Sequence, residues 1–399
     1  MSSSTSPARL LTCFALALAL AASPVRPARA VTIDLVTVGN AGNANDTTGY
    51  GAVNYEYQIG KYEVTISQYA AFLNAVAKTD TYALYNGAMA SNGNIAGIVQ
   101  GGSPGNLTYS VLDNAGNSGN RPITYVNWWA VARFANWMAN GQPTGPQNAT
   151  TTENGAYAVN GNNDGDVPNK NSINPNTGLP PTFYMPTENE WYKAAYYSPT
   201  LNGGAGGYYT FATQSNDFPG NTIGSGVGNQ ANYNDGVYAV TGSADYVEAQ
   251  NYLTAVGAFS DSPSYYGTFD QSGNVYEWND LTGTFIGNGG GVRGGNWFDI
   301  WFNLQSSRRS QPAATSDLGY AGFRLAAPVA VPEPSTYCMA IAGLACGGYV
   351  VFRRRKRALH SEASLIPTRG EQVAITGLLP SVFTRAVSTR SAGFVAPAA

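Results

Sequence analysis

The side chains that could carry out chemistry in the central part of this chain are carboxylates, hydroxyls and amides. The three cysteines are Cys13, Cys338 and Cys346, and the single histidine is His360, so all four lie near the ends. The region from 31 to 327 therefore has no residue for a disulfide, a cysteine nucleophile or a Ser-His-Asp triad. The usual zinc, copper and haem ligand sets are excluded in the same way.

Carboxylates are the remaining candidates for catalysis. A glycoside hydrolase needs two carboxyl groups on one cleft, about 5–9.5 Å apart. The candidates here are Glu188, Glu190, Asp280 and Asp299. Their separations do not follow from the sequence, so a carboxylate hydrolase stays open.

The first 30 residues have the order of a secretory signal peptide. Arg9 gives a basic start, residues 10–22 form an apolar run, and residues 28–30 read Ala-Arg-Ala, a small-x-small cleavage signal. The run is too short to span a bilayer, which takes about 20 residues. We expect the mature chain to begin near Val31.

A second apolar run lies near the other end. It spans residues 337–352, and a cluster of five cations follows at 353–357. At about 1.5 Å per residue it would extend about 24 Å, slightly less than a hydrocarbon core of about 30 Å. We predict one transmembrane helix, with the cations in the cytoplasm and the long N-terminal part outside. Residues 328–336 are a proline-rich linker, and 353–399 are predicted to be the basic cluster and a disordered tail.

The part expected outside the membrane is acidic. Residues 31–350 contain 10 lysines and arginines against 22 aspartates and glutamates, a net charge of −12. Phosphate contacts need clustered cations. We therefore expect no nucleic-acid partner.

Three helices are predicted, each with a start signal. Thr65 and Thr187 open capping boxes, in which a hydroxyl and an amide or carboxylate satisfy backbone groups at the helix start. Asn127 can cap a helix between these two. Apolar residues follow each cap at helical spacing.

Strand-like runs are short and the connecting stretches are long. The runs lie at 31–38, 55–59, 251–256 and 292–297. Stretches rich in Gly, Asn, Ser and Thr occupy roughly 80–120, 139–180 and 199–250, and loops this long need a reason. They could be disordered, held by cations or cross-loop hydrogen bonds, or present a binding surface. This pattern predicts a single α+β domain over 31–327.

Six short motifs follow one another in the order in which they occur in one family of proteins. Residues 273–278, for example, read G-N-V-Y-E-W where family members have G-N-V-W-E-W, and 185–191 read M-P-T-E-N-E-W for L-P-T-E-A-E-W. The others lie at 60–65, 122–128, 293–297 and 322–324. Together they resemble the formylglycine-generating enzyme, or sulfatase-modifying factor, family. The resemblance implies a C-type-lectin-like fold with little regular secondary structure. The tryptophans of these motifs are predicted core residues, and Arg324 is expected to neutralise a buried carboxylate.

The catalytic branch of that family uses two cysteines shortly after the Gly-Gly-Ser segment to bind copper. Here the segment from Asn296 to Gln305 has neither cysteine. Asp299 is a hard oxygen donor, whereas copper chemistry of this kind needs a soft thiolate. We therefore predict no catalytic residue for formylglycine formation and no copper.

The resemblance also implies calcium. One family site maps onto Asp270 and Glu277 with the carbonyls of Gly273 and Val275, a mixture of oxygen donors that suits Ca²⁺. A weaker second site maps onto Asn232, Tyr233, Gly257 and Phe259. The alternative for Glu277 is an ion pair with an arginine such as Arg324.

The C-terminal region resembles a PEP-CTERM sorting signal. Pro332-Glu333-Pro334 precedes the apolar run, and Arg353, Arg354 and Arg355 open the basic cluster. Such signals are processed by an exosortase in bacteria that make extracellular polysaccharide. We expect an exported protein of the cell surface or outer envelope, anchored in the membrane before processing.

Three functions follow as hypotheses. The favoured one is a non-catalytic surface protein that binds glycan or another component of the extracellular matrix. The second is an oxidoreductase-type modifying enzyme of the family, and the third is an accessory partner of an exported sulfatase.

Overall fold

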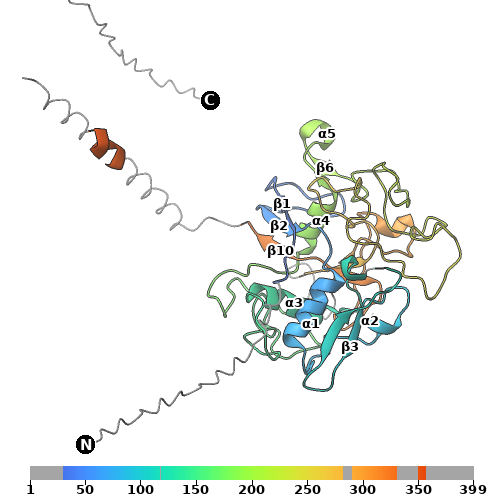
Figure 1. The fold of residues 1–399 in the computed structure, drawn as a ribbon. Coiled ribbons are helices and arrows are strands. Elements are labelled where there is room, and N and C mark those ends of the chain that lie inside the picture. The colour runs from blue at the N-terminus through green and yellow to red at the C-terminus, as the bar shows by residue number, and fades with distance from the viewer. Residues whose placement is uncertain (1–29, 117, 282–289, 330–348, 356–399) are drawn as a thin grey trace, which may run out of the picture. The chain divides into compact units, whose positions relative to one another are not determined.

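The computed structural model describes residues 30–116, 118–281, 290–329 and 349–355. Backbone contacts divide the chain into two units, 1–330 and 331–399. In the first unit, short helices and strands are separated by long irregular connections (Figure 1). The predicted α+β class with sparse regular structure is confirmed.

The three predicted helices are present with their predicted caps. They are α1 (Ile66–Val76), α3 (Trp128–Ala139) and α4 (Glu188–Tyr196). Capping boxes open α1 and α4, and the Asn127 side chain accepts from the third residue of α3. In the first unit, the described residues also form four shorter helical segments: α2 (Ala88–Ser91), η1 (Ser118–Asn120), α5 (Leu201–Gly204) and η2 (Trp301–Leu304).

Two three-stranded sheets link distant parts of the first unit. In one, β2 (Tyr57–Gly60) lies between β1 (Leu35–Val38) and β10 (Ala326–Pro328), with both pairs antiparallel. In the other, β7 (Tyr276–Asn279) pairs antiparallel with β8 (Gly291–Arg293) and parallel with β9 (Ala321–Phe323). The two-stranded ribbons are β3 (Ile98–Gly101) with β4 (Thr108–Val111) and β5 (Tyr197–Ser198) with β6 (Gly207–Tyr208).

One strand prediction is wrong. Runs 31–38, 55–59 and 292–297 contain or overlap β1, β2 and β8, but residues 251–256 form no strand. Side chains bind this backbone where a neighbouring strand was expected. Leu253 N–H donates to Asn251 Oδ1 (3.0 Å), and Thr254 N–H donates to Asn274 Oδ1 (3.2 Å). The sequence indicated an extended run without revealing that asparagine side chains would supply two of its hydrogen-bond partners.

Asparagine side chains also hold the long connections together. Nδ2 of Asn94 donates to the carbonyls of Val247 (3.1 Å), Glu248 (3.0 Å) and Gln250 (2.9 Å), more than 150 residues away. These bonds satisfy loop carbonyls that no strand or helix reaches. Of the three explanations for the long stretches, cross-loop hydrogen bonding is the one observed here.

The largest core lies between α1 and α3 and is aromatic. The Phe72 and Phe134 rings meet edge to face at 5.2 Å, and Phe134 meets Phe323 of β9 in the same way. The predicted core tryptophans are confirmed as buried: Trp128, Trp191, Trp278 and Trp297. This core fixes both helices against the second sheet.

The second unit is described only at residues 349–355, which are helical and exposed. The sorting residues Pro332, Glu333 and Pro334 and most of the predicted membrane segment 337–352 lie outside the described residues, as does the signal peptide up to residue 29. Within the described ranges, no helix has the length and apolarity needed to cross a bilayer.

Candidate functional site

Glu277 on β7, one of the two carboxylates predicted to bind calcium, is already paired with a cation. Arg324 donates from Nε and from a terminal nitrogen to the two Glu277 oxygens, each at 2.6 Å. The Trp191 indole N–H adds a third bond to the same carboxylate (2.8 Å). All three side chains are fully buried. We call this group the Glu277–Arg324 centre.

The centre joins segments that are far apart in the sequence. Arg324 also donates to the carbonyls of Gly60 (2.9 Å) and Phe269 (2.8 Å). Four of the six motifs, those containing Gly60, Trp191, Glu277 and Arg324, therefore meet at one ion pair. The expectation that Arg324 neutralises a buried carboxylate is confirmed, and these motifs serve the fold.

A second pair of carboxylates lies beside the centre. Asp270 accepts from the Gly257 N–H (2.6 Å), and Glu63 accepts from Asn274 Nδ2 (3.0 Å). The other Glu63 oxygen is buried without a hydrogen-bond partner. Burial raises the pKa of Asp270 to about 6. Burial and the neighbouring Asp270 carboxylate raise the pKa of Glu63 well above its usual range.

The structure brings the two predicted calcium sets together. Gly257 of the second set binds Asp270 of the first, and the Asn232 carbonyl accepts from Asn274 N–H (2.8 Å) beside Gly273. Gly273 has a φ of +88°, and a Cβ there would come 2.3 Å from the Asn232 carbonyl oxygen. Only glycine allows this close approach.

Two of the predicted calcium donors already have partners within the protein. Glu277 has both oxygens on Arg324, and the Phe259 carbonyl accepts from the Ser262 N–H. Over the described ranges, no group of three or more acidic, histidine or cysteine side chains is arranged to hold a metal ion. Calcium binding stays a prediction of the sequence, which the metal content of the purified protein would test.

The segment where the family's catalytic cysteines are expected forms a hydrogen-bonded turn. The Asp299 carboxylate accepts from Asn296 Nδ2 (2.8 Å) and from Asn303 Nδ2 (2.7 Å). Burial raises the pKa of Asp299. The segment offers hard oxygen and amide groups only, so copper finds no soft ligand in it.

An open pocket of about 520 Å³ lies next to this turn and is lined mainly by rings and amides. We call it the aromatic pocket. Its lining comes from five separate parts of the chain: Asn92, Asn94, Ile95, Tyr125, Tyr238, Tyr246, Trp297, Phe298, Asp317, Leu318, Gly319 and Tyr320. No lysine or arginine is among these residues.

Trp297 forms the buried part of the pocket wall. Its ring stacks on Tyr252 with centroids 4.7 Å apart and planes at 5°. The side chain is 7% exposed, yet its indole N–H has no hydrogen-bond partner. A buried donor without a partner costs about 1–3 kcal/mol.

Two tyrosines complete the polar rim. The Tyr125 hydroxyl accepts from Asn92 Nδ2 (2.8 Å), and its backbone lies in the left-handed region with φ +57°. That conformation is unfavourable for an aromatic residue and is often found at functional sites. Tyr246 is 54% exposed, and its hydroxyl donates to Asn94 Oδ1.

The four carboxylates considered for hydrolysis all have structural partners. Glu188 lies between Arg293 (2.7 Å) and Arg309 (2.9 Å), and Glu190 completes the α4 capping box. Asp280 accepts from the Tyr157 hydroxyl (3.1 Å), and Asp299 holds its own turn. None is presented as an unbonded general base, so the arrangement does not favour hydrolysis.

Sequence reasoning placed Trp297 in the core but did not predict the pocket. Its other walls come from residues near 92–95, 125, 238–246 and 317–320, and no motif connects them. The only signal was the wealth of tyrosine and asparagine in the long stretches.

The fold defines a class of protein: an α+β domain of sparse regular secondary structure. A family profile for the sulfatase-modifying factor enzyme 1-like domain (FGE-sulfatase) matches residues 36–329. The chain belongs to this family. A second profile, the PEP-CTERM protein-sorting motif, matches residues 330–356. The motif marks an exported, surface- or envelope-associated protein that an exosortase processes.

Solved structures give a weak likeness. CarF is 18% identical with a TM-score of 0.37, covering 75% of this chain and 99% of its own. Treponema denticola variable protein 1 is 19% identical (TM-score 0.39; 75% and 96%). PvdO from Pseudomonas aeruginosa is 16% identical (0.38; 74% and 92%). At these scores nothing about function follows from them. No curated protein matches this chain.

Proposed function

We propose that the exported domain binds extracellular glycan at the aromatic pocket and catalyses no reaction there. The supporting observation is the lining of this pocket, in which the ring of Trp297 and several tyrosine rings lie beside the amide side chains of Asn92 and Asn94. Sugars present C–H faces to aromatic rings and hydroxyl oxygens to such donors, which suits this lining.

The charge of the pocket narrows the glycan class. Asp317 is the one charged residue in the lining. A polyanion with carboxylate or sulfate groups would meet no cation there and would approach an acidic domain. Neutral polysaccharide is therefore the proposed ligand class.

The proposed absence of redox catalysis has separate support. The segment 296–305 offers no thiolate, and Asp299 is engaged by two asparagines. A copper site of the family's kind has no ligands in that segment.

Affinity electrophoresis tests this function. It compares how strongly neutral and sulfated polysaccharides retain the exported protein. Tyr246→Ala removes an exposed ring from the rim and should weaken binding to neutral glycan about tenfold, equivalent to about 1.4 kcal/mol. Tyr265→Ala is the matched control, because Tyr265 is also exposed (39%) and lies outside the pocket lining. Equal retention of both variants, or preference for the sulfated polymer, would refute the proposal.

A further inference from the structure

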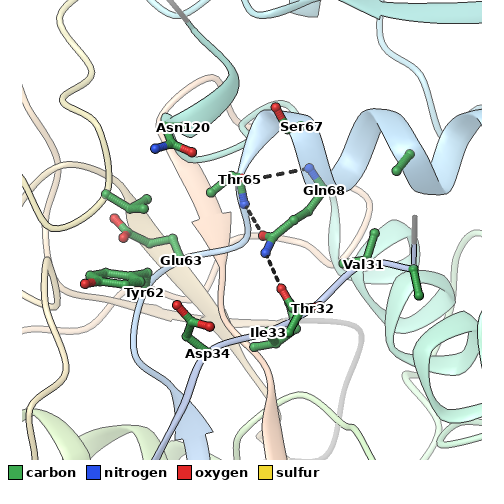
Figure 2. A pocket seen from close by; sticks show the side chains of 13 residues that line it. Val31, Thr32, Ile33, Asp34, Tyr62, Glu63, Thr65, Ser67, Gln68 and Asn120 are labelled. Carbon is green, nitrogen blue, oxygen red and sulfur yellow. Dashed lines mark hydrogen bonds between the residues drawn. The ribbon is translucent and has the colours of Figure 1, made fainter. Parts of the chain in front are cut away.

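The start of the described chain is held tightly to the domain. Residues 30–34 form one wall of a pocket of about 560 Å³ opposite the start of α1 (Figure 2). The Thr32 carbonyl accepts from Gln68 Nε2 (2.8 Å), and the Asp34 carbonyl accepts from the Lys61 N–H (2.7 Å). The Val31 side chain is 9% exposed and belongs to the main core. The ordered fold therefore includes Val31 itself.

A single side chain satisfies both backbone groups of Val31. The Val31 N–H donates to Gln142 Oε1 (2.6 Å), and Gln142 Nε2 donates to the Val31 carbonyl (2.7 Å). The two residues are 111 positions apart. A primary amide is suited to this double contact because it carries a donor and an acceptor side by side.

The backbone of Gln142 is unusual for a glutamine. It has φ +61° and follows Gly141, which has φ +79°. Its N–H donates to the Trp137 carbonyl (2.9 Å) in the closing turn of α3. Glycine or asparagine is the usual residue in a left-handed position after a helix. A glutamine kept there indicates that its side chain is needed.

We infer that the chain is cut between Ala30 and Val31 and that Gln142 captures the new N-terminus. A signal peptidase hydrolyses the amide bond with one water, leaving a carboxylate on Ala30 and an ammonium on Val31. The ammonium keeps the bond to Gln142 Oε1, now as a charge-assisted bond. It also stands near the end of α3, which has no basic residue in its last turn and favours a cation there.

The contact between Val31 and Gln142 distinguishes a cut before Val31 from cuts at neighbouring peptide bonds. A cut two residues earlier, after Ala28, would leave Val31 N as an ordinary amide and place the charge away from Gln142. A cut after Val31 would remove the core side chain and both bonds.

The first test is the intact mass and N-terminal sequence of the exported protein from its own host. A start at Val31 is expected. Any other start overturns the inference.

The second test separates capture from simple packing. Gln142→Gly relieves the left-handed strain but removes the clamp, and it should lower Tm by about 2–4 °C and speed acylation of the Val31 amine several-fold, as located by peptide mapping. Asn160→Gly is the matched control, because Asn160 is exposed and also has a positive φ (+52°). It should leave amine acylation unchanged and Tm equal or higher. A Gln142→Gly protein with normal Tm and amine reactivity would contradict the capture.

Discussion

The Glu277–Arg324 centre and the aromatic pocket belong to the same domain but satisfy their polar groups in opposite ways. In the centre, both carboxylate oxygens are bonded to a buried guanidinium, and an indole N–H completes the set. In the pocket, the Trp297 N–H has no partner and Tyr246 is half exposed. Closed networks of this kind specify a fold, whereas exposed rings beside a cavity are available to a ligand.

Breaking the centre should produce the largest effect. Arg324→Leu leaves Glu277 buried without its cation, which typically costs about 3–5 kcal/mol. We expect the variant to unfold at much lower urea concentration or to fail to fold. Glu248→Gln, at an exposed carboxylate, is the control and should unfold like the parent. A variant of Arg324 with parental stability would show that the centre does not hold the fold.

Asn94 lines the aromatic pocket and also stabilises the loop at residues 247–250. Asn94→Ala removes the three bonds to the carbonyls of 247, 248 and 250 and the partner of the Tyr246 hydroxyl. We expect a loss of about 1–3 kcal/mol in the free energy of unfolding, together with weaker glycan retention. Unchanged retention in the folded variant would mean that Tyr246 needs no support from Asn94.

Trp297→Phe sharpens the contrast between fold and function. The substitution keeps a buried ring and deletes a donor that has no partner in the unbound protein. The smaller ring leaves a gap beside Tyr252, so the free energy of unfolding should fall by about 1–2 kcal/mol, while glycan affinity falls about two- to tenfold with the smaller aromatic surface. Thermal unfolding and a binding titration on the same sample measure both. Loss of stability with unchanged glycan affinity would mean that Trp297 serves the fold and not glycan binding.

Lys193 provides a smaller, pH-dependent test. It measures the free-energy cost of burying an ammonium group whose hydrogen bond goes to a backbone carbonyl. Its ammonium donates to the Asn40 carbonyl (2.9 Å), and burial lowers the pKa of Lys193 to about 8. Between about pH 8 and the usual lysine value near 10.4, the unfolded chain binds more protons than the folded one. Stability from this group should therefore rise with pH from 8 to 9.5.

The Lys193→Met variant is the reference for that titration, since it lacks the ionisable group. Urea unfolding at pH 7.5 and pH 9.5 should show a larger gain for the parent than for the variant. Equal gains would mean that burial does not disfavour the charged lysine.

The local part of the fold was predictable because its signals are local. Thr65, Asn127 and Thr187 cap the helices that their spacing predicts, and the tryptophans of the motifs are buried. The pairing of Arg324 with a carboxylate also followed from the cost of burying a charge. The parallel pairing of β7 with β9 links residues 276–278 to 321–323, and no periodicity shows it.

The candidate site was less predictable for a related reason. The aromatic pocket depends on asparagines that bond to distant carbonyls, such as Asn94 to Gln250, and such partners are not encoded by spacing. The run 251–256 forms no strand because its backbone N–H groups donate to asparagine side chains and to isolated loop carbonyls instead of to a neighbouring strand. Composition indicated tyrosine- and asparagine-rich loops but not which rings would meet.

The most direct test of the account assays one preparation of the exported protein twice. One half is titrated with neutral exopolysaccharide from its own host, and the other is incubated under air with copper and a cysteine-containing sulfatase peptide. The account predicts saturable glycan binding that Trp297→Phe weakens, and no conversion of the thiol to an aldehyde. Aldehyde formation, or the absence of glycan binding by the folded protein, would contradict it.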